Sequence, residues 1–290
     1  MKKLIILTSL VTIFCLACNQ KPAPEKDEAI VAETSSENLN LIGFWVGQFE
    51  AKDYKKDAEY VYSNRLNIAI KAIIGDDVTA QSIVAGNSRL LKGKILRKDG
   101  KVTFELAEPG DDKYDGKFEF ELINNKLVGF WESFDKNLAV TKRIFELERK
   151  EFVYDANLML PENDYMDRYS GKDKQVTDTI DGEPETYTDK FYRASSESVY
   201  TINSSTHEFT EKELKNYKKL DLEILRNTIF ARHGYSFKKK GYRQFFDHVD
   251  WYIPVTANVD GELTALEKAN IKLFQRFEKY AEDNYDTFGR

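Results

Sequence analysis

Hydrophobic and polar residues alternate with a period of two over most of residues 41–150. Val102, Phe104 and Leu106, for example, alternate with polar neighbours. This period is typical of strands with one buried face. The alternating runs are separated by residues that tolerate the positive φ of tight turns: Gly75-Asp76-Asp77, Asp99-Gly100, Asp115-Gly116 and Asn124-Asn125. The pattern predicts antiparallel strands near residues 42–51, 60–74, 78–85, 90–97, 101–107, 117–123, 127–134 and 139–149.

These strands most simply close into an up-and-down barrel, because closure removes exposed strand edges. Gly43-Phe44-Trp45 resembles the Gly-x-Trp opening of lipocalin-like barrels, and the motif is echoed by Gly129-Phe130-Trp131. The resemblance implies a basic residue of the last strand lying across Trp45, for which Arg143 and Arg149 are the candidates. A plain β-core with two aromatic strands is the alternative interpretation. Small barrels either hold one ligand or are filled by their own side chains, and the sequence leaves both open.

The period changes to that of helices after residue 209. Thr210 with Glu213 predicts a capping box, and a longer helix is expected from Asp221 to His233, ending at Gly234. A third short helix follows that helix. After it, Pro254 favours an extended chain at the residues that immediately precede the proline. Thr264 and Glu267 predict the start of a last helix. Residues 209–285 therefore form a small all-α module, and residues 151–208, which fit neither period, form a connector with a few short strands.

The N-terminus indicates export. Lys2 and Lys3 precede an apolar stretch, Leu4 to Ala17, that suits a signal peptide and is too short to span a bilayer. Cys18 follows at once, which resembles a bacterial lipobox, although Cys15 stands where Leu is usual. We expect a signal peptide over 1–17, lipidation of Cys18 and a flexible tether over 18–40 that is rich in Lys, Glu, Ala, Pro and Ser. Plain cleavage that leaves an ordinary thiol is the alternative.

The composition limits the chemistry. Cys15 and Cys18 are the only cysteines, so the exported chain is expected to have no disulfide, no thiol nucleophile and no cysteine metal cluster. The 3 histidines are too scattered for a recognised zinc spacing, and there is no glycine-rich phosphate loop. A net charge of −6 and the expected location make nucleic acid a poor partner. We expect no metal and no cofactor.

One motif stands out in the helical region, Leu225 to Phe237, LRNTIFARHGYSF. Together with Trp251, Tyr252 and the later Glu267, it resembles the YARHG domain, a bacterial module taken to be extracellular, with Phe230 in place of the family's Tyr. The resemblance covers about residues 210–280. It implies no settled biochemical activity. It does make its motif residues the candidate binding residues: Arg226, Asn227, Arg232, His233, Trp251 and Tyr252.

Two interpretations of these residues compete. In the structural one, Arg232 is buried against Asp247, Asp250, Glu267 or carbonyl groups between Gly234 and Pro254, and the other motif residues brace helix turns. In the functional one, Arg232, His233, Trp251 and Tyr252 form the floor of a site in which rings stack on sugars and arginine holds anions. Residues 212–243 carry ten Lys or Arg against three Asp or Glu, a net of +7, which suits an anionic partner.

The expected fold class is α+β, with a lipocalin-like antiparallel barrel over 41–150 followed by the YARHG-like module. The expected protein is a lipid-anchored cell-envelope protein, in the outer membrane of a Bacteroidetes-like bacterium. It is expected to bind peptidoglycan or an anionic polysaccharide without catalysis. Two alternatives remain: an accessory or weak hydrolase that uses His233, and a carrier of a small ligand or lipid within the barrel.

Overall fold

The computed structural model describes residues 36–57 and 62–284. The expected signal peptide, Cys18 and most of the expected tether lie outside the described residues. The end of that tether, α1 (Ser36–Leu39), is a single helical turn. Among the described residues no helix combines the length and the apolar character that crossing a bilayer requires.

Eight antiparallel strands form a closed barrel in which each strand pairs with the next and the last pairs with the first. Each strand begins and ends close to its expected bounds. The strands are β1 (Gly43–Tyr54), β2 (Ser63–Ile74), β3 (Asp77–Val84), β4 (Asn87–Lys98), β5 (Lys101–Ala107), β6 (Gly116–Ile123), β7 (Lys126–Ser133) and β8 (Val140–Lys150). The antiparallel barrel predicted from the alternation is confirmed, and it is consistent with the lipocalin-like resemblance of Gly43-Phe44-Trp45.

The tight turns agree with most of the sequence signals. Asp99-Gly100 has φ of 53° and 75°, and Asn124-Asn125 has φ of 50° and 62°. Such paired positive values match the right-handed twist of the flanking strands. The Asp115-Gly116 turn was wrongly predicted, because Gly116 begins β6 and a longer loop runs from Glu108 to Asp115.

Apolar side chains of the strands pack in the barrel interior, and Phe49, Phe118 and Trp131 among them also line a pocket of about 460 Å³. Apolar residues from all eight strands form one buried cluster, and Phe104 and Phe120 stack there with ring centroids 4.7 Å apart. Trp45 is buried in the same cluster, and its indole N–H donates to the Leu41 carbonyl at 2.8 Å. Arg149 is the cross-strand neighbour of Trp45 on β8 and donates to the Ile42 carbonyl.

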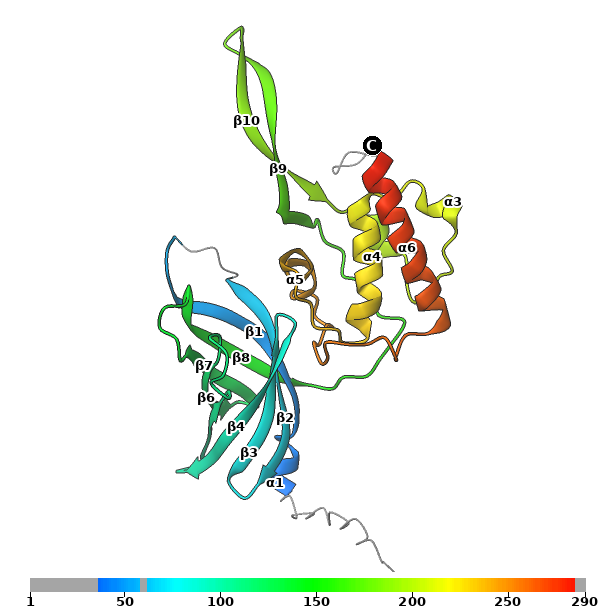
Figure 1. Cartoon of the computed structure of the whole chain (residues 1–290). Coiled ribbons are helices and arrows are strands. Elements are labelled where there is room, and N and C mark those ends of the chain that lie inside the picture. The colour runs from blue at the N-terminus through cyan, green and yellow to red at the C-terminus, as the bar shows by residue number, and fades with distance from the viewer. Residues whose placement is uncertain (1–35, 58–61, 285–290) are drawn as a thin grey trace, which may run out of the picture. The chain divides into compact units, whose positions relative to one another are not determined.

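The connector contains two strands that are much longer than expected. β9 (Met166–Ile180) and β10 (Glu183–Ala194) form a separate two-stranded antiparallel sheet. Figure 1 shows this hairpin without a third strand beside it. Its turn is Asp181-Gly182, with φ of 52° and 90°. The sequence did not predict the length of these strands. Both of their faces are largely exposed, so no alternation of apolar and polar residues marks them.

Five helices build the C-terminal module: α2 (Ser198–Thr201), α3 (Glu211–Leu214), α4 (Lys219–Arg232), α5 (Lys240–Phe246) and α6 (Ala265–Asn284). The capping box of Thr210 and Glu213 is confirmed. The same exchange occurs before α6, where the Thr264 amide donates to Glu267 at 2.9 Å. Gly234 ends α4 with φ of 73°, as expected of a residue that tolerates the left-handed region.

Candidate functional site

Arg232 lies in the last turn of α4 and is 2% exposed. Its Nε and Nη2 donate to the Leu158 carbonyl at 2.8 and 2.7 Å, and its Nη1 donates to the hydroxyl groups of Ser204 and Ser205. Burial lowers the pKa of Arg232 to about 10, against the opposing influence of Glu267. Of the charge partners predicted from the sequence, Glu267 favours the charged form of Arg232. The hydrogen-bond partners Leu158, Ser204 and Ser205 lie within residues 151–208 and were not predicted, because the motif does not reveal them.

His233 lies at the end of α4, where it could donate a hydrogen bond to free carbonyl groups of the last turn. In the structure its partner is a carboxylate instead. Its Nε2 lies 2.9 Å from Glu267 Oε2, and the two side chains are 4% and 0% exposed. The Tyr154 hydroxyl donates to the other Glu267 oxygen at 3.0 Å, and its ring stacks on His233 with centroids 4.2 Å apart. Burial alone would raise the pKa of Glu267, but hydrogen bonds from Thr264, Ser205 and His233 bring it below its ordinary value.

Arg226 and Asn227 brace neighbouring structure. The Asn227 amide donates to the Glu223 carbonyl one turn earlier at 2.7 Å. Arg226 makes a two-pronged contact with Glu278 of α6, from Nε at 2.5 Å and from Nη2 at 3.2 Å. This pair joins α4 to α6, which lie side by side in Figure 1. A fork of this kind fixes orientation as well as distance.

The two aromatic candidates also have structural partners. The Tyr252 side chain is 1% exposed, and its hydroxyl donates to the Tyr235 carbonyl at 2.7 Å. Trp251 is partly buried, and its indole N–H donates to the Met159 carbonyl at 2.7 Å. Arg232, His233 and Tyr252 therefore lie inside the module, where a ligand does not reach them without rearrangement.

A second buried ion network joins the hairpin to α4. Arg193, at the end of β10, lies 2.7 Å from Asp167 at the start of β9 and 3.0 Å from Glu223 on α4. Each of these side chains is 7% exposed. Sequence reasoning missed this network, since nothing local marks three charges as partners when they are separated by tens of residues.

An open pocket of about 560 Å³ lies beside the motif helix. Arg226 and Asn227 reach it, and aromatic and lysine side chains from the segment after Gly234 complete it. Lys239 Nζ lies 4.5 Å from the centroid of the Tyr242 ring. The other pocket residues, none of which was predicted to be a binding residue, are Phe230, Tyr235, Phe237, Lys238, Lys239, Tyr242, Ala257, Asn258, Val259 and Asp260. The signal that could have found the pocket is the close spacing of aromatic and lysine residues over 235–242.

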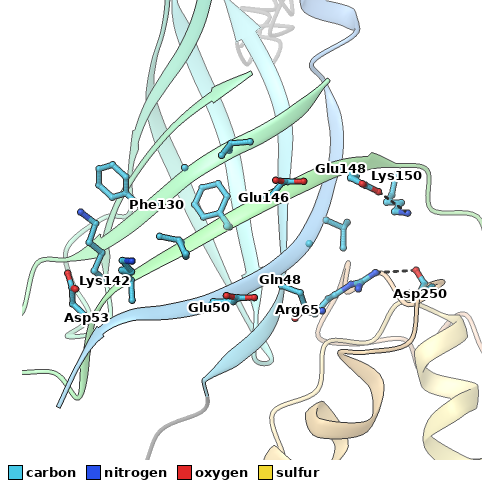
Figure 2. Close-up of a pocket in the computed structure, with 17 residues that line it drawn as sticks. Gln48, Glu50, Asp53, Arg65, Phe130, Lys142, Glu146, Glu148, Lys150 and Asp250 are labelled. Carbon is cyan, nitrogen blue, oxygen red and sulfur yellow. Dashed lines mark hydrogen bonds and ion pairs between the residues drawn. The ribbon is translucent and has the colours of Figure 1, made fainter. Parts of the chain in front are cut away.

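A larger groove of about 1040 Å³ lies on the outer face of the barrel, mainly on β1, β7 and β8 (Figure 2). Its lining carries five acidic and four basic side chains. Glu146 and Glu148 pair with Lys126 at 2.6 and 3.0 Å, and Lys142 lies 4.1 Å from the centroid of the Phe130 ring. The groove thus presents only a small excess of acidic groups. Within residues 36–57 and 62–284 no three His, Cys, Asp or Glu side chains gather as a metal site would require.

The fold and site define a closed eight-stranded barrel joined to a helical module in which a motif arginine and histidine are buried. Residues 198–279 match the YARHG domain family, so the chain carries a YARHG domain. The match begins earlier than the sequence resemblance did and includes Ser204 and Ser205, which hold Arg232. No curated protein matches the chain.

Proposed function

We propose that this protein is a lipid-anchored cell-envelope protein whose YARHG domain binds an anionic cell-wall polysaccharide without catalysis. The observation that carries the proposal is the open pocket beside α4, where aromatic rings and lysine side chains converge. Aromatic faces stack on sugar rings, and ammonium groups attract carboxylates and phosphates. This pocket replaces the expected floor of Arg232, His233, Trp251 and Tyr252, none of which lines it.

Charge in the pocket supports an acidic ligand. The guanidinium of Arg226 is balanced by Glu278, so the lysines Lys238 and Lys239 are the pocket's basic side chains that carry the attraction. Asp260 is the acidic side chain among the lining residues. A pocket of this size lies within the range of natural small-ligand sites, ~300–1000 Å³, and suits one or two sugar rings.

The buried state of His233 supports a binding role over a hydrolytic one. A general base must come within hydrogen-bond reach of the proton that it abstracts. His233 is instead covered by the Tyr154 ring and bonded to a fully buried Glu267. A hydrolase based on this pair would need Tyr154 to leave its place, so the hydrolase stays the weaker alternative. The carrier alternative is weakened as well, because apolar side chains from all eight strands pack together in the barrel interior.

Binding is tested by co-sedimentation of the protein with purified peptidoglycan sacculi and with lipopolysaccharide. The test variant is Lys238→Gln/Lys239→Gln, which removes two charges from the pocket. Its matched control is Lys268→Gln/Lys272→Gln, which removes two charges from exposed positions on α6 of the same domain. The pocket variant should lose most of the bound fraction, and the control should keep it. Equal binding by both variants, or no binding by the wild type, contradicts the proposal.

The anchor is tested separately. Wild-type protein should incorporate labelled palmitate and fractionate with outer membranes, whereas Cys18→Ser should do neither. Cys18 is the residue that lipoprotein processing would acylate. Incorporation of equal label into the Cys18→Ser variant would remove the anchor from the proposal, and would leave the polysaccharide site untouched.

A further inference from the structure

The β9–β10 hairpin is a two-stranded sheet with both faces open. Beyond the Asp167–Arg193 pair at its base, its side chains are mostly exposed. Several are large and apolar: Tyr169, Ile180, Tyr187 and Phe191 are 38–47% exposed. In the part of the chain that the structure describes, no third strand joins this sheet. Hairpins of two strands are marginally stable alone, and an open strand edge is a template for another strand.

The two edges of the hairpin differ. The two-residue turn at Asp181-Gly182 makes Ile180 and Glu183 the closing pair of the ladder. Because backbone groups of successive residues point to opposite sides, odd-numbered residues of β9 direct their N–H and C=O groups away from β10. On β10 the outward positions are even-numbered, and one of them is Pro184, which has no N–H to donate. The β9 edge is therefore the better acceptor of a further strand.

The sequence of that edge is complementary to itself. Residues 174–178 of β9 read Lys-Gln-Val-Thr-Asp. When two copies of this segment run antiparallel about Val176, Lys174 of each lies opposite Asp178 of the other. Gln175 then lies opposite Thr177, and these are odd-numbered positions whose backbone groups point outward. Side-chain pairing and backbone hydrogen bonding are thus satisfied by the same register.

The hairpin alone leaves one charge conflict that this arrangement relieves. Asp178 lies directly opposite Glu185 of β10. Like charges at opposite positions destabilise a sheet. In the paired arrangement Lys174 of the second copy comes to the other side of Asp178. Val176 also neighbours Tyr187 across the hairpin, so two copies would bring two valine and two tyrosine side chains into one apolar strip.

We propose that two copies of this chain associate through antiparallel β9–β9 pairing, centred on Val176, to form a four-stranded sheet. The contact is isologous, so it closes a dimer and does not continue into a filament. Tethering of both copies to one membrane would raise their effective concentration and strengthen a weak contact. The proposal does not depend on the polysaccharide site.

The first test compares proline substitutions on the two edges. Thr177→Pro removes an outward N–H from β9, and Thr186→Pro removes one from β10. The two threonines lie opposite each other and share one hydroxyl hydrogen bond of 2.8 Å, so both variants lose the same internal contact. Sedimentation velocity on the full chain carrying Cys18→Ser should show dimers for the parent and for Thr186→Pro, and monomers for Thr177→Pro. Circular dichroism checks that each variant is folded.

The second test exchanges charges. Lys174→Glu places Glu opposite Asp178 in a dimer, and Asp178→Lys places Lys opposite Lys174, so each variant alone should be monomeric. An equimolar mixture should form heterodimers, because each copy then presents the opposite charge to the other. A purely structural effect of either substitution gives no such rescue. A parent chain that stays monomeric up to ~1 mM, or a mixture that stays monomeric when the parent dimerises, overturns the proposal.

Discussion

The barrel and the YARHG domain bury different kinds of interior. The main cluster of the barrel consists of apolar side chains, and its strands pair in chain order. The barrel also buries the carboxylate of Glu108, but its donors Ser82, Gly116 and Trp131 lie within 26 positions of it. The YARHG domain buries Arg232, His233 and Glu267 within an aromatic core, where partners from distant segments hydrogen-bond these polar groups. Burial of apolar side chains requires matching volume and pattern, whereas each buried ion requires its own partner in place. The apolar cluster of the barrel should therefore tolerate substitution that the buried ions of the YARHG domain do not.

The largest effect is expected from Arg232→Ala. The substitution leaves the Leu158 carbonyl and the hydroxyl groups of Ser204 and Ser205 without their donor in a buried site. We expect a loss of about 3–5 kcal/mol in the free energy of unfolding of the YARHG domain, with the barrel transition unchanged. Urea denaturation followed by the helical circular dichroism signal measures it, because α2 to α6 all lie in the C-terminal module whereas two of the three tryptophans lie in the barrel. Arg276→Ala is the control, since the Arg276–Glu211 pair is exposed and should contribute little.

Glu267→Gln should have the next largest effect. The carboxylate accepts hydrogen bonds from the Thr264 amide and the Tyr154 hydroxyl and lies against His233. Gln keeps one acceptor oxygen but replaces the other with a donor, for a loss of about 1.5–3 kcal/mol. The pKa of Glu267 is lowered in the folded state, so its contribution is present above the unfolded pKa of ~4.3 and is lost as pH falls through the folded value.

The pH profile provides the check on this variant. Thermal denaturation of the wild type should show stability falling below about pH 4. The Glu267→Gln variant should start lower and show a flatter acid limb. A parallel fall in both proteins would mean that other carboxylates, such as the exposed Glu213 in its capping box, set the acid limb instead.

Sequence predicted the barrel better than the site, and the reason is the range of the interactions. Hairpin pairing joins neighbours in the chain, so alternation and turn residues were sufficient for β4 and β5, which the Asp99-Gly100 turn joins. Helix caps at Thr210 and Thr264 were equally local. The partner of Arg232 lies 74 positions away at Leu158, in a connector without a period, and no local pattern specifies it. The length of β9 and β10 was not predicted, because strands that are exposed on both faces do not show alternation of apolar and polar residues.

A smaller effect is expected from Phe104→Leu in the barrel. Phe104 is fully buried and stacks on Phe120, and Leu is a smaller apolar residue that neighbouring side chains partly accommodate. We expect a loss below about 1.5 kcal/mol, and no change in the YARHG domain. Arg232→Lys makes the contrast sharp, because lysine cannot reproduce the two donors on one carbonyl and should cost more than Phe104→Leu. A barrel more sensitive than the YARHG domain in this pair would reverse the comparison.

An effect of opposite sign is expected from Asp247→Asn. Asp247 is buried beside the C-terminus of α5, and the Arg65 amide donates to its Oδ2 at 3.0 Å. Burial raises the pKa of Asp247 to about 7 because it outweighs that hydrogen bond and the charges of Arg243 and Arg65. The folded state then holds the proton more tightly than the unfolded state, so stability falls as pH rises from about 4 to about 7. Asn keeps an acceptor oxygen and has no charge to desolvate. The melting temperature of Asp247→Asn should exceed that of the wild type at pH 8 and match it at pH 4. A variant that is less stable than the wild type at pH 8 would contradict this prediction. It would show that the interactions of the ionised carboxylate with its neighbours outweigh the free energy of its desolvation.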